Sequence, residues 1–438
     1  MHCIVNSGRS LRPFLLLWFT QLLSSLGSSM TSFALVLWSY QAEGSALTTA
    51  LLSVCSYAPY VAASLFAGAL SDRWNKKRTM LVCDFLAALC TLTVLFLFHG
   101  GALALWHLYL INAGTGLMNS VQQPASDVAV TLLTPRQYYQ RVSGLRALSA
   151  SLTNTLSPVL ATALFSLAGL GGVICFDLAA FVLAFSTLLL GISIPDVPSG
   201  RTGREPVLQS VRAGLGYLRA HRGILDLILF LAAINLTASM FNAALPALVL
   251  SRPWGGQTAL GLIQGISGGA MLLGGAAASL LPAPKSRVRV ICGALLLAMS
   301  TENFFLALGR SVPVWCLGAA LGWIGIPLMN ANMDALFRGY IPVELQGRVY
   351  SARNSLQFFT IPLGYLLGGA LVDLLFEPLS ARMAGCAPWV LLFGTGKGSG
   401  AAALFLLLGA LGVITCLIFR RDPYIRALED PPRRTHTV

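Results

Sequence analysis

Long apolar segments separated by short polar ones dominate this chain from end to end. The apolar runs extend over about 20 residues, the length that a helix needs to cross ~30 Å of hydrocarbon. We therefore predict an all-α integral membrane protein. Its twelve predicted spans lie at residues 14–40, 46–70, 79–98, 105–132, 142–168, 173–194, 224–250, 258–281, 290–309, 312–337, 349–375 and 399–419.

Composition supports the membrane interpretation. Of the 438 residues, 56% are hydrophobic and only 10% are charged, whereas soluble domains carry about a quarter charged residues. The first apolar run follows Arg9 and Arg12 and could be taken for a signal peptide. It is longer than the signal-peptide core of about 7–15 residues, however, so we predict a retained helix.

The net charge of +13 is distributed unevenly along the chain. Positive residues concentrate in the termini and in alternate loops, the pattern of cytoplasmic segments in membrane proteins. We therefore predict cytoplasmic termini, a location in the cell (inner or plasma) membrane, and the lipid bilayer rather than nucleic acid as a partner. The opposite side holds only four of the 29 Lys and Arg residues: Arg252, Arg310, Arg382 and Lys397.

Cysteine and histidine give no sign of a cofactor site. The nine cysteines are scattered without a C-x-x-C pair, and the five histidines form no cluster with metal-ligand spacing. We expect no disulfide framework, no metal and no cofactor.

The two halves of the chain resemble each other at a constant spacing. "TPRQYYQRVSGLRALS", from Thr134, matches "IPVELQGRVYSARNSL", from Ile341, and the same spacing of 207 residues carries Asp127 onto Asp334. Two similar halves in one orientation are typical of secondary transporters, whose substrate site lies between the repeats near the bilayer midplane. We predict a six-helix bundle at 1–194, a linker at 195–222, a second six-helix bundle at 223–420 and a cytoplasmic tail at 421–438.

The linker has one apolar face. It predicts an amphipathic helix on the inner membrane surface, although a solvated connector remains the alternative. The residues that share this face are Val207, Leu208, Val211, Leu215 and Leu218.

The polar stretch "AGALSDRWNKKRTM", Ala67 to Met80, lies between the second and third predicted spans. Gly68 lacks a side chain, which lets the second span pack closely on a neighbour. Asp72 places an anion at a helix end, where it can meet the positive N-terminus of another helix. The cations of this loop need acidic partners, and Asp127 near the inner end of span four is the best placed. A plain positively charged loop is the alternative.

This stretch resembles the signature loop of the major facilitator superfamily, G-x-x-x-D-R-x-G-R-[RK]. Asn75 stands in place of the second glycine, and asparagine tolerates the left-handed backbone of that position. The resemblance implies the two-bundle fold of that superfamily, in which Asp72 meets the eleventh helix and the loop is a conformational latch. The predicted latch residues are Gly68, Asp72, Arg73, Lys76, Lys77 and Asp127, and the second-half cluster is Asp334, Arg348 and Arg353.

Span five carries part of an antiporter pattern, G-x8-G-x3-G-P-x2-G-G. Gly144 and Pro158 match it, and Ser157 supplies a small residue in place of glycine. Several other segments resemble the macrolide-efflux and enterobactin-export branch of the superfamily, which implies export of a drug or secondary metabolite driven by protons. These segments include "QPASDVAVTLLTPRQ", "GYLRAHRG" and "PLGYLLGGALVDLLFEPL".

Polar side chains at helical spacing suggest a substrate cavity. In span four they share one face of a helix, and the resemblance implies that spans one, four, seven and ten line the cavity. Hydrogen bonding between helices is the alternative for each residue. The predicted cavity residues are Asn112, Asn119 and Gln123 in span four, Asn235 and Asn242 in span seven, and Trp323 and Asn330 in span ten.

Proton coupling requires an acid whose proton affinity changes as a cavity opens and closes. Glu302 lies deepest in a span and has no evident cationic partner, so we assign it this role, with Asp84 as the second candidate. We expect Asp177, Asp226 and Asp373 to lie near helix ends where water reaches them.

These features predict a monomeric secondary transporter. We expect it to export a bulky amphipathic small molecule by alternating access, in exchange for protons. A lipid translocase or an uptake symporter with the same fold is an alternative, and a non-transporting receptor is less favoured because the predicted latch loop is present. Nothing in the sequence resembles an enzyme site.

Overall fold

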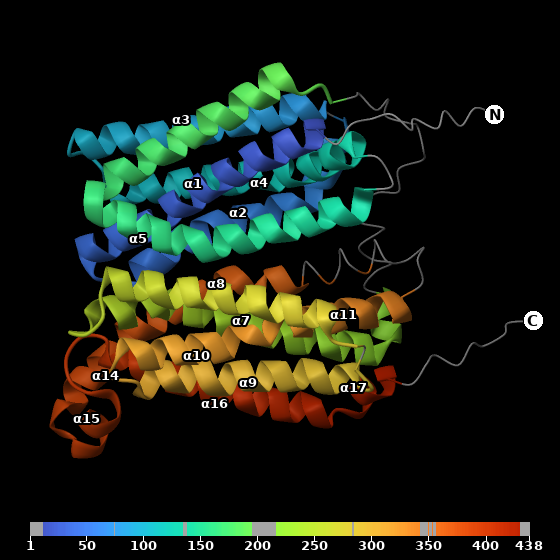
Figure 1. Ribbon diagram of the computed structural model, residues 1–438. Helices are drawn as coiled ribbons and strands as arrows, with labels where there is room; N and C mark the ends of the chain where they lie inside the picture. The colour runs from blue at the N-terminus through green and yellow to red at the C-terminus, as the bar shows by residue number, and fades with distance from the viewer. Residues whose placement is uncertain are drawn as a thin grey trace, which may run out of the picture. The chain divides into compact units, whose positions relative to one another are not determined.

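The computed structural model describes residues 12–73, 75–134, 138–194, 216–282, 284–341, 349, 353 and 356–429, and in them it is helical without a strand (Figure 1). The all-α membrane fold predicted from the sequence is confirmed. The first helices are α1 (Arg12–Glu43), α2 (Ala46–Arg73), α3 (Lys76–His99), α4 (Leu105–Leu133) and α5 (Tyr139–Ser186), followed by the π-helix η2 (Thr187–Gly191).

The later part of the chain contains more helices, several of them short. The long ones are α7 (Arg222–Ser251), α8 (Gln257–Leu280), α9 (Arg287–Leu308), α10 (Val312–Ile324), α11 (Ile326–Tyr340), α13 (Thr360–Ala370) and α16 (Ser399–Arg421). The short ones are the π-helix η3 (Leu371–Phe376), α14 (Glu377–Arg382), η4 (Met383–Gly385), α15 (Ala387–Phe393), α17 (Pro423–Arg426) and η5 (Ala427–Glu429).

Ten helical segments of the described residues are long and apolar enough to cross a membrane, against twelve predicted. Two features account for the difference. Leu148–Gly191 counts once although it has 44 residues and breaks at Gly169, whose φ of 66° interrupts the helix. Helix α4 has 29 residues but is not among the ten, because its amide and carboxyl side chains lower its hydropathy.

The contacts within the chain divide it into two compact units. Unit 1 comprises Met1–Leu35 and Ala58–Gly203, and unit 2 comprises Val36–Tyr57 and Arg204–Val438. Unit 2 therefore includes the end of α1 and the beginning of α2 in addition to the second half of the sequence. The limits predicted for the two halves, 1–194 and 223–420, stay a prediction.

The core of unit 1 forms where α1, α3, α4, α5 and η2 meet. Phe14, Met80, Ala129 and Leu188 are fully or almost fully buried there. Close packing of these apolar side chains stabilises helix association, and the same helices also carry the polar side chains that surround a cavity.

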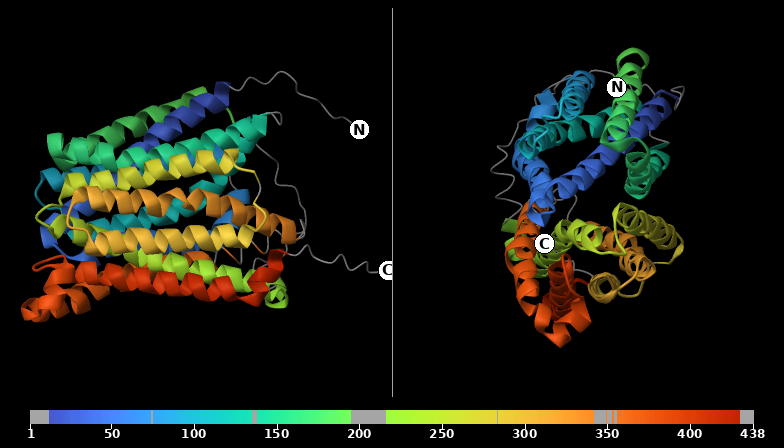
Figure 2. Two further views of the ribbon diagram at one scale, coloured as in Figure 1. Left: turned by 60° about the horizontal axis from the view of Figure 1, so that its bottom comes forward. Right: turned by 90° about the vertical axis from the view of Figure 1, so that its left-hand side faces the viewer.

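Unit 2 has a larger core, formed by α7, α9, α11, α16 and α17. Helices α9 and α16 lie side by side along their length (Figures 1 and 2). Phe230 of α7 stacks on Phe419 of α16 with ring centroids 4.9 Å apart. Leu218, from the predicted linker helix, is also fully buried in this core, while the other residues of the predicted apolar linker face lie outside the described part of the chain.

Candidate functional site

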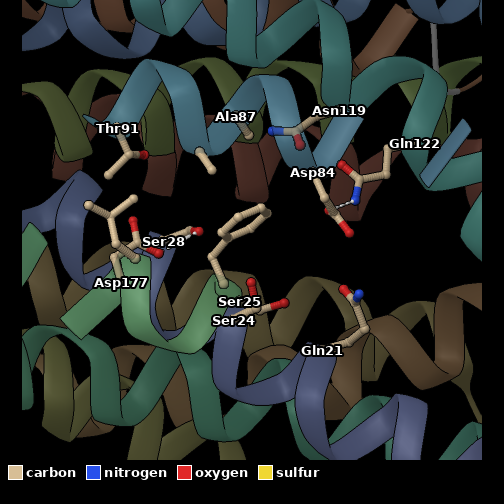
Figure 3. Close-up of a pocket in the computed structure, with 13 residues that line it drawn as sticks. Gln21, Ser24, Ser25, Ser28, Asp84, Ala87, Thr91, Asn119, Gln122 and Asp177 are labelled. Carbon is tan, nitrogen blue, oxygen red and sulfur yellow. Dashed lines mark hydrogen bonds between the residues drawn. The ribbon is translucent and has the colours of Figure 1, made fainter. Parts of the chain in front are cut away.

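A polar pocket of about 160 Å³ lies inside unit 1, between α1, α3, α4 and α5 (Figure 3). Its lining combines amides, hydroxyls and two carboxyl groups, and the lining residues include no basic side chain. Phe181 supplies an aromatic wall. The polar lining residues are Gln21, Ser24, Ser25 and Ser28 from α1, Asp84 and Thr91 from α3, Asn119 and Gln122 from α4, and Asp177 from α5.

Asp84 is held on one side of the pocket by α4, because Gln122 Nε2 donates to its Oδ1. The other carboxyl oxygen, Oδ2, and Gln21 Nε2 are both shielded from solvent, and neither forms a hydrogen bond of good geometry among the described residues, although the two side chains lie close enough to interact. Gln21 lies across the pocket from Asp84 (Figure 3). Buried polar atoms are seldom left without partners, so these two atoms mark a place where a polar ligand or water can bind.

Asp177 lies at the other end of the pocket and is only 4% exposed. Ser28 Oγ donates to its Oδ1 over 3.0 Å. Gly27 makes this approach possible, since a Cβ there would lie 2.9 Å from both Asp177 Cα and Oδ1. Asp177 was expected near a helix end open to water; instead it is buried, because α1 packs closely over it, and it meets only the enclosed pocket.

The resemblance placed span one at the cavity, but sequence reasoning named none of the α1 residues that line this pocket. Gln21, Ser24, Ser25 and Ser28 fall at intervals of three, four and seven residues, which places them on one side of a helix. That spacing was a usable signal. The serines did not stand out because a serine in an apolar helix can satisfy its hydroxyl on the preceding turn.

The residues predicted to line the cavity are dispersed. Asn119 lies in the unit 1 pocket. Asn112 Nδ2 donates to Leu108 O over 2.8 Å and Asn242 Nδ2 to Ala238 O over 2.9 Å, each within its own helix. Trp323 and Asn330 belong to unit 2, where Asn330 is exposed, and Asn235 is half-buried in α7.

Glu302 belongs to α9 in unit 2, and its side chain packs against α10. It is 7% exposed, and its Oε1 accepts a hydrogen bond of 2.8 Å from Trp323 Nε1. A Cβ at Gly322 would lie 2.9 Å from Glu302 Oε2, so this glycine lets α10 approach the carboxyl group. Within the described part of the chain no cation forms an ion pair with Glu302, which agrees with the reason for its selection.

The acids assigned to the latch clusters form ion pairs at positions related by the 207-residue spacing of the two halves. Arg146 of α5 donates to Asp127 of α4, and Arg353 lies 3.8 Å from Asp334 of α11. The two acids are 207 positions apart, and so are the two arginines. The structure thus places equivalent acid–arginine pairs in the two halves, each within its own unit.

Lys77, in the predicted latch loop, binds elsewhere than expected. Its Nζ donates to Leu189 O and Ile192 O, 2.9 and 2.7 Å away, where the wider turn of η2 ends. The expected pairing of this lysine with Asp127 is therefore not found. The surroundings of Gly68 and the side chains of Asp72 and Arg73 lie outside what the structure describes, as does Arg348, while Lys76 begins α3.

Span five keeps part of its predicted small-residue face. Ser157 and Pro158 are buried in α5, and Thr162 Oγ1 donates to Pro158 O over 2.7 Å. Gly144 belongs to α5, but its surroundings lie outside what the structure describes.

Comparison with known proteins identifies the family of this chain. The model of the Major Facilitator Superfamily matches residues 17–365. The chain belongs to the major facilitator superfamily. The resemblance inferred from the loop at Gly68–Lys77 is thereby confirmed.

Two relatives within this superfamily are named for export. Macrolide efflux protein A of Streptococcus pyogenes is 22% identical over 386 residues, which cover 87% of this chain and 92% of that protein. The enterobactin exporter EntS of Escherichia coli is 25% identical over 334 residues, covering 73% of this chain and 76% of that protein. Both belong to the branch that the sequence segments resemble.

A solved structure of a transporter has a similar fold. A mutant form of the nucleoside transporter NupG aligns with a TM-score of 0.67 over 93% of this chain and 98% of its own, at 12% identity. This likeness in fold agrees with the superfamily match over residues 17–365 and with a multi-pass membrane protein.

Proposed function

We propose that this protein exports a bulky amphipathic small molecule by alternating access, in exchange for protons. The observation that carries the proposal is the match to macrolide efflux protein A over 87% of this chain. The protein works as a monomer in the cell membrane with both termini in the cytoplasm, the side where positive residues concentrate. Its two halves, 1–194 and 223–420, alternate in opening to the two sides.

The pocket of unit 1 supplies part of the substrate site. Its volume of about 160 Å³ is too small for a whole macrolide-sized molecule. It can receive one polar group of such a molecule, because Asn119 and Gln21 offer amides and Asp84 offers a carboxyl group. The remaining predicted residues, Asn112, Gln123, Asn235, Asn242, Trp323 and Asn330, complete the proposal for the cavity.

Glu302 carries the proton. A charge buried this deeply without a cation costs several kcal/mol, so the group must exchange a proton when its surroundings become wet. Asp84 is the second candidate, because its Oδ2 is shielded from solvent and no cation among the described residues forms an ion pair with it.

The loop from Gly68 to Lys77 acts as a latch on the cytoplasmic side. Lys77 ties the beginning of α3 to the end of η2, which gives the loop a fixed base inside unit 1. Asp127 and Asp334, with Arg146 and Arg353, fix the neighbouring helix ends in each half.

Asp72→Asn is expected to slow transport severalfold while leaving the amount of protein in the membrane unchanged. The substitution removes the charge that favours a helix N-terminus, an interaction of about 0.3–1 kcal/mol in exposed positions and up to ~2 when partly buried. Initial rates of export per molecule of inserted protein measure the effect. Asp127→Asn is measured in the same way, to compare loss of the Asp127–Arg146 ion pair inside unit 1 with loss of the Asp72 charge. An unchanged export rate for Asp72→Asn would remove the latch from the proposal.

Export itself is tested in inside-out vesicles that contain the purified protein. A radiolabelled macrolide should accumulate inside when the vesicle interior is made acidic, and it should leak out when an ionophore removes the pH gradient. Accumulation with the interior made alkaline would instead show an uptake symporter. A fluorescent phospholipid in the same vesicles tests the lipid translocase.

Asn119→Ala serves as the matched variant in this experiment. It removes one amide from the pocket without touching a core residue, so it should raise the KM for the exported compound while the protein remains folded. If Asn119→Ala transports like the parent and Asn330→Ala does not, the substrate is bound by the polar residues predicted in span ten rather than by those of span four.

A further inference from the structure

Asp373 of η3 binds the N-terminal end of a helix that is more than 320 positions away in the sequence. Its Oδ1 accepts from Ala46 N over 3.1 Å, and its Oδ2 accepts from Leu47 N over 2.8 Å and from Ser45 Oγ over 2.6 Å. Helix α2 begins at Ala46. The first N–H groups of a helix have no partner within it, and a carboxylate there is favourable for charge as well as hydrogen bonding.

The adjacent segment of the first half is fastened to the second half by other contacts. Tyr40 OH, near the end of α1, lies 2.6 Å from Ser251 Oγ, and it donates to Ala247 O over 3.2 Å. A Cβ at Gly369 would lie 2.7 Å from Leu47 Cα, so only glycine lets α13 approach α2 this closely. These contacts all lie within unit 2, and they explain why Val36–Tyr57 belongs to it.

Glu377 provides an internal comparison, because it lies four residues after Asp373 and caps a different helix. Its Oε1 accepts from Gly398 N over 2.9 Å and from Ala401 N over 3.2 Å, at the beginning of α16. Arg252, after α7, donates to the carbonyls of Phe393 and Thr395 in the same region. Burial lowers the pKa of the Arg252 guanidinium, and the nearby Glu377 carboxylate opposes this shift. Glu377 thus joins parts of the second half only, whereas Asp373 joins the second half to the first.

We propose that Asp373 is a latch that holds the outer end of the transporter closed, by capping α2 from the other half of the sequence. This inference rests on the proposed alternating access and on the proposed orientation, which puts the connection between α1 and α2 outside. The three hydrogen bonds of Asp373 must break when the outer end opens, since they join segments from different halves.

The latch is suited to repeated opening. When Asp373 leaves α2, water can replace each hydrogen bond, so the net stabilisation by the contact is far smaller than the sum of its bonds. Ser45 Oγ also accepts from Thr48 N over 3.0 Å, which leaves α2 with a cap of its own in the open state. The helix can therefore remain intact while the contact with Asp373 forms and breaks.

The experiment measures how often the outer end opens, through the reactivity of a buried thiol. Thr49 is 3% exposed and lies one turn into α2, and cysteine replaces threonine with little change in size. A variant with its nine native cysteines changed to serine receives Thr49→Cys. A membrane-impermeant maleimide is then added to right-side-out vesicles, and the labelling rate is recorded with and without Asp373→Asn.

Asp373→Asn should raise the labelling rate by roughly two- to thirtyfold, the range expected from losing a helix cap. Asp373→Glu retains the charge and should fall between the parent and Asp373→Asn. Glu377→Gln is the matched control, because it removes a cap of similar geometry within the second half, and it should leave the rate unchanged. Thermal unfolding of each variant in detergent shows whether labelling reports opening or loss of structure.

Three results would overturn the inference. They are an unchanged rate for Asp373→Asn, an equal rise for Glu377→Gln, and labelling that occurs only in inside-out vesicles. The labelling assay needs no substrate, so it tests the Asp373 contact separately from the proposed function. If the protein exports no macrolide but Asp373→Asn still raises the labelling rate, the proposed substrate is refuted and the inference about Asp373 stands.

Discussion

Export driven by a pH gradient is expected to disappear in Glu302→Gln, with a loss of at least tenfold in the initial rate. Glutamine keeps the size of the side chain and can still accept the hydrogen bond from Trp323 Nε1, but it cannot bind or release a proton. The tight approach of Gly322 to this side chain is also preserved. Transport of a radiolabelled macrolide into inside-out vesicles with an acidic interior measures the loss.

Exchange of labelled for unlabelled compound, without a pH gradient, separates coupling from folding. A coupling residue can be lost while exchange continues, whereas a misfolded protein loses both activities. Glu302→Asp is the matched control, because it keeps a carboxyl group at this position, so it should retain part of the gradient-driven export that Glu302→Gln loses. If Glu302→Gln still responds to the gradient, Asp84→Asn becomes the variant to test.

The sequence predicted the membrane fold and the superfamily because both depend on local, repeated signals. Apolar runs and the spacing of 207 residues can be counted without knowing which helices touch. The repeat also anticipated the equivalence of Asp127 and Asp334, which the structure shows in their ion pairs with Arg146 and Arg353. Their partners were harder to predict, because the choice between an arginine on the next helix and a lysine in a loop depends on packing.

The pocket of unit 1 could be predicted only in part, for the same reason. Asn119 and Asp84 were selected as polar residues in apolar helices, and the structure brings both to one cavity. Asp177 was not selected, because it was expected near a helix end open to water. Its burial depends on Gly27, in a helix 150 residues earlier. Such an approach between distant helices leaves no periodic signal in either one.

The contact of Asp373 with α2 could not be predicted from the sequence either. Nothing local distinguishes Asp373 from Glu377, since both are acids in the same stretch, four residues apart. Their different partners follow from the position of α13 against α7 and α2, where glycines permit close packing. The packing of α13 therefore decides what the following π-helix can reach.

Gly368→Leu is accordingly expected to prevent unit 2 from assembling. Helix α13 packs on α7 through Gly364 and Gly368, a pair of small residues four positions apart of the kind that lets membrane helices approach closely. A Cβ at Gly368 would lie 2.7 Å from both Met240 Cα and Met240 O. The obstacle is backbone rather than a movable side chain, so the cost should reach or exceed the ~3 kcal/mol upper range of overpacking.

The measurement is the free energy of unfolding in detergent, together with the fraction of protein that elutes as a single species. Gly269→Leu is the control, because nothing lies within 4 Å of a Cβ at that position on α8, and it should remain folded. Displacement of α13 would also carry η3 away from Ala46, so any Gly368→Leu protein that does fold should show the rapid Thr49→Cys labelling expected for Asp373→Asn. A Gly368→Leu protein as stable as the parent would contradict the close contact between α13 and α7, on which the position of Asp373 depends.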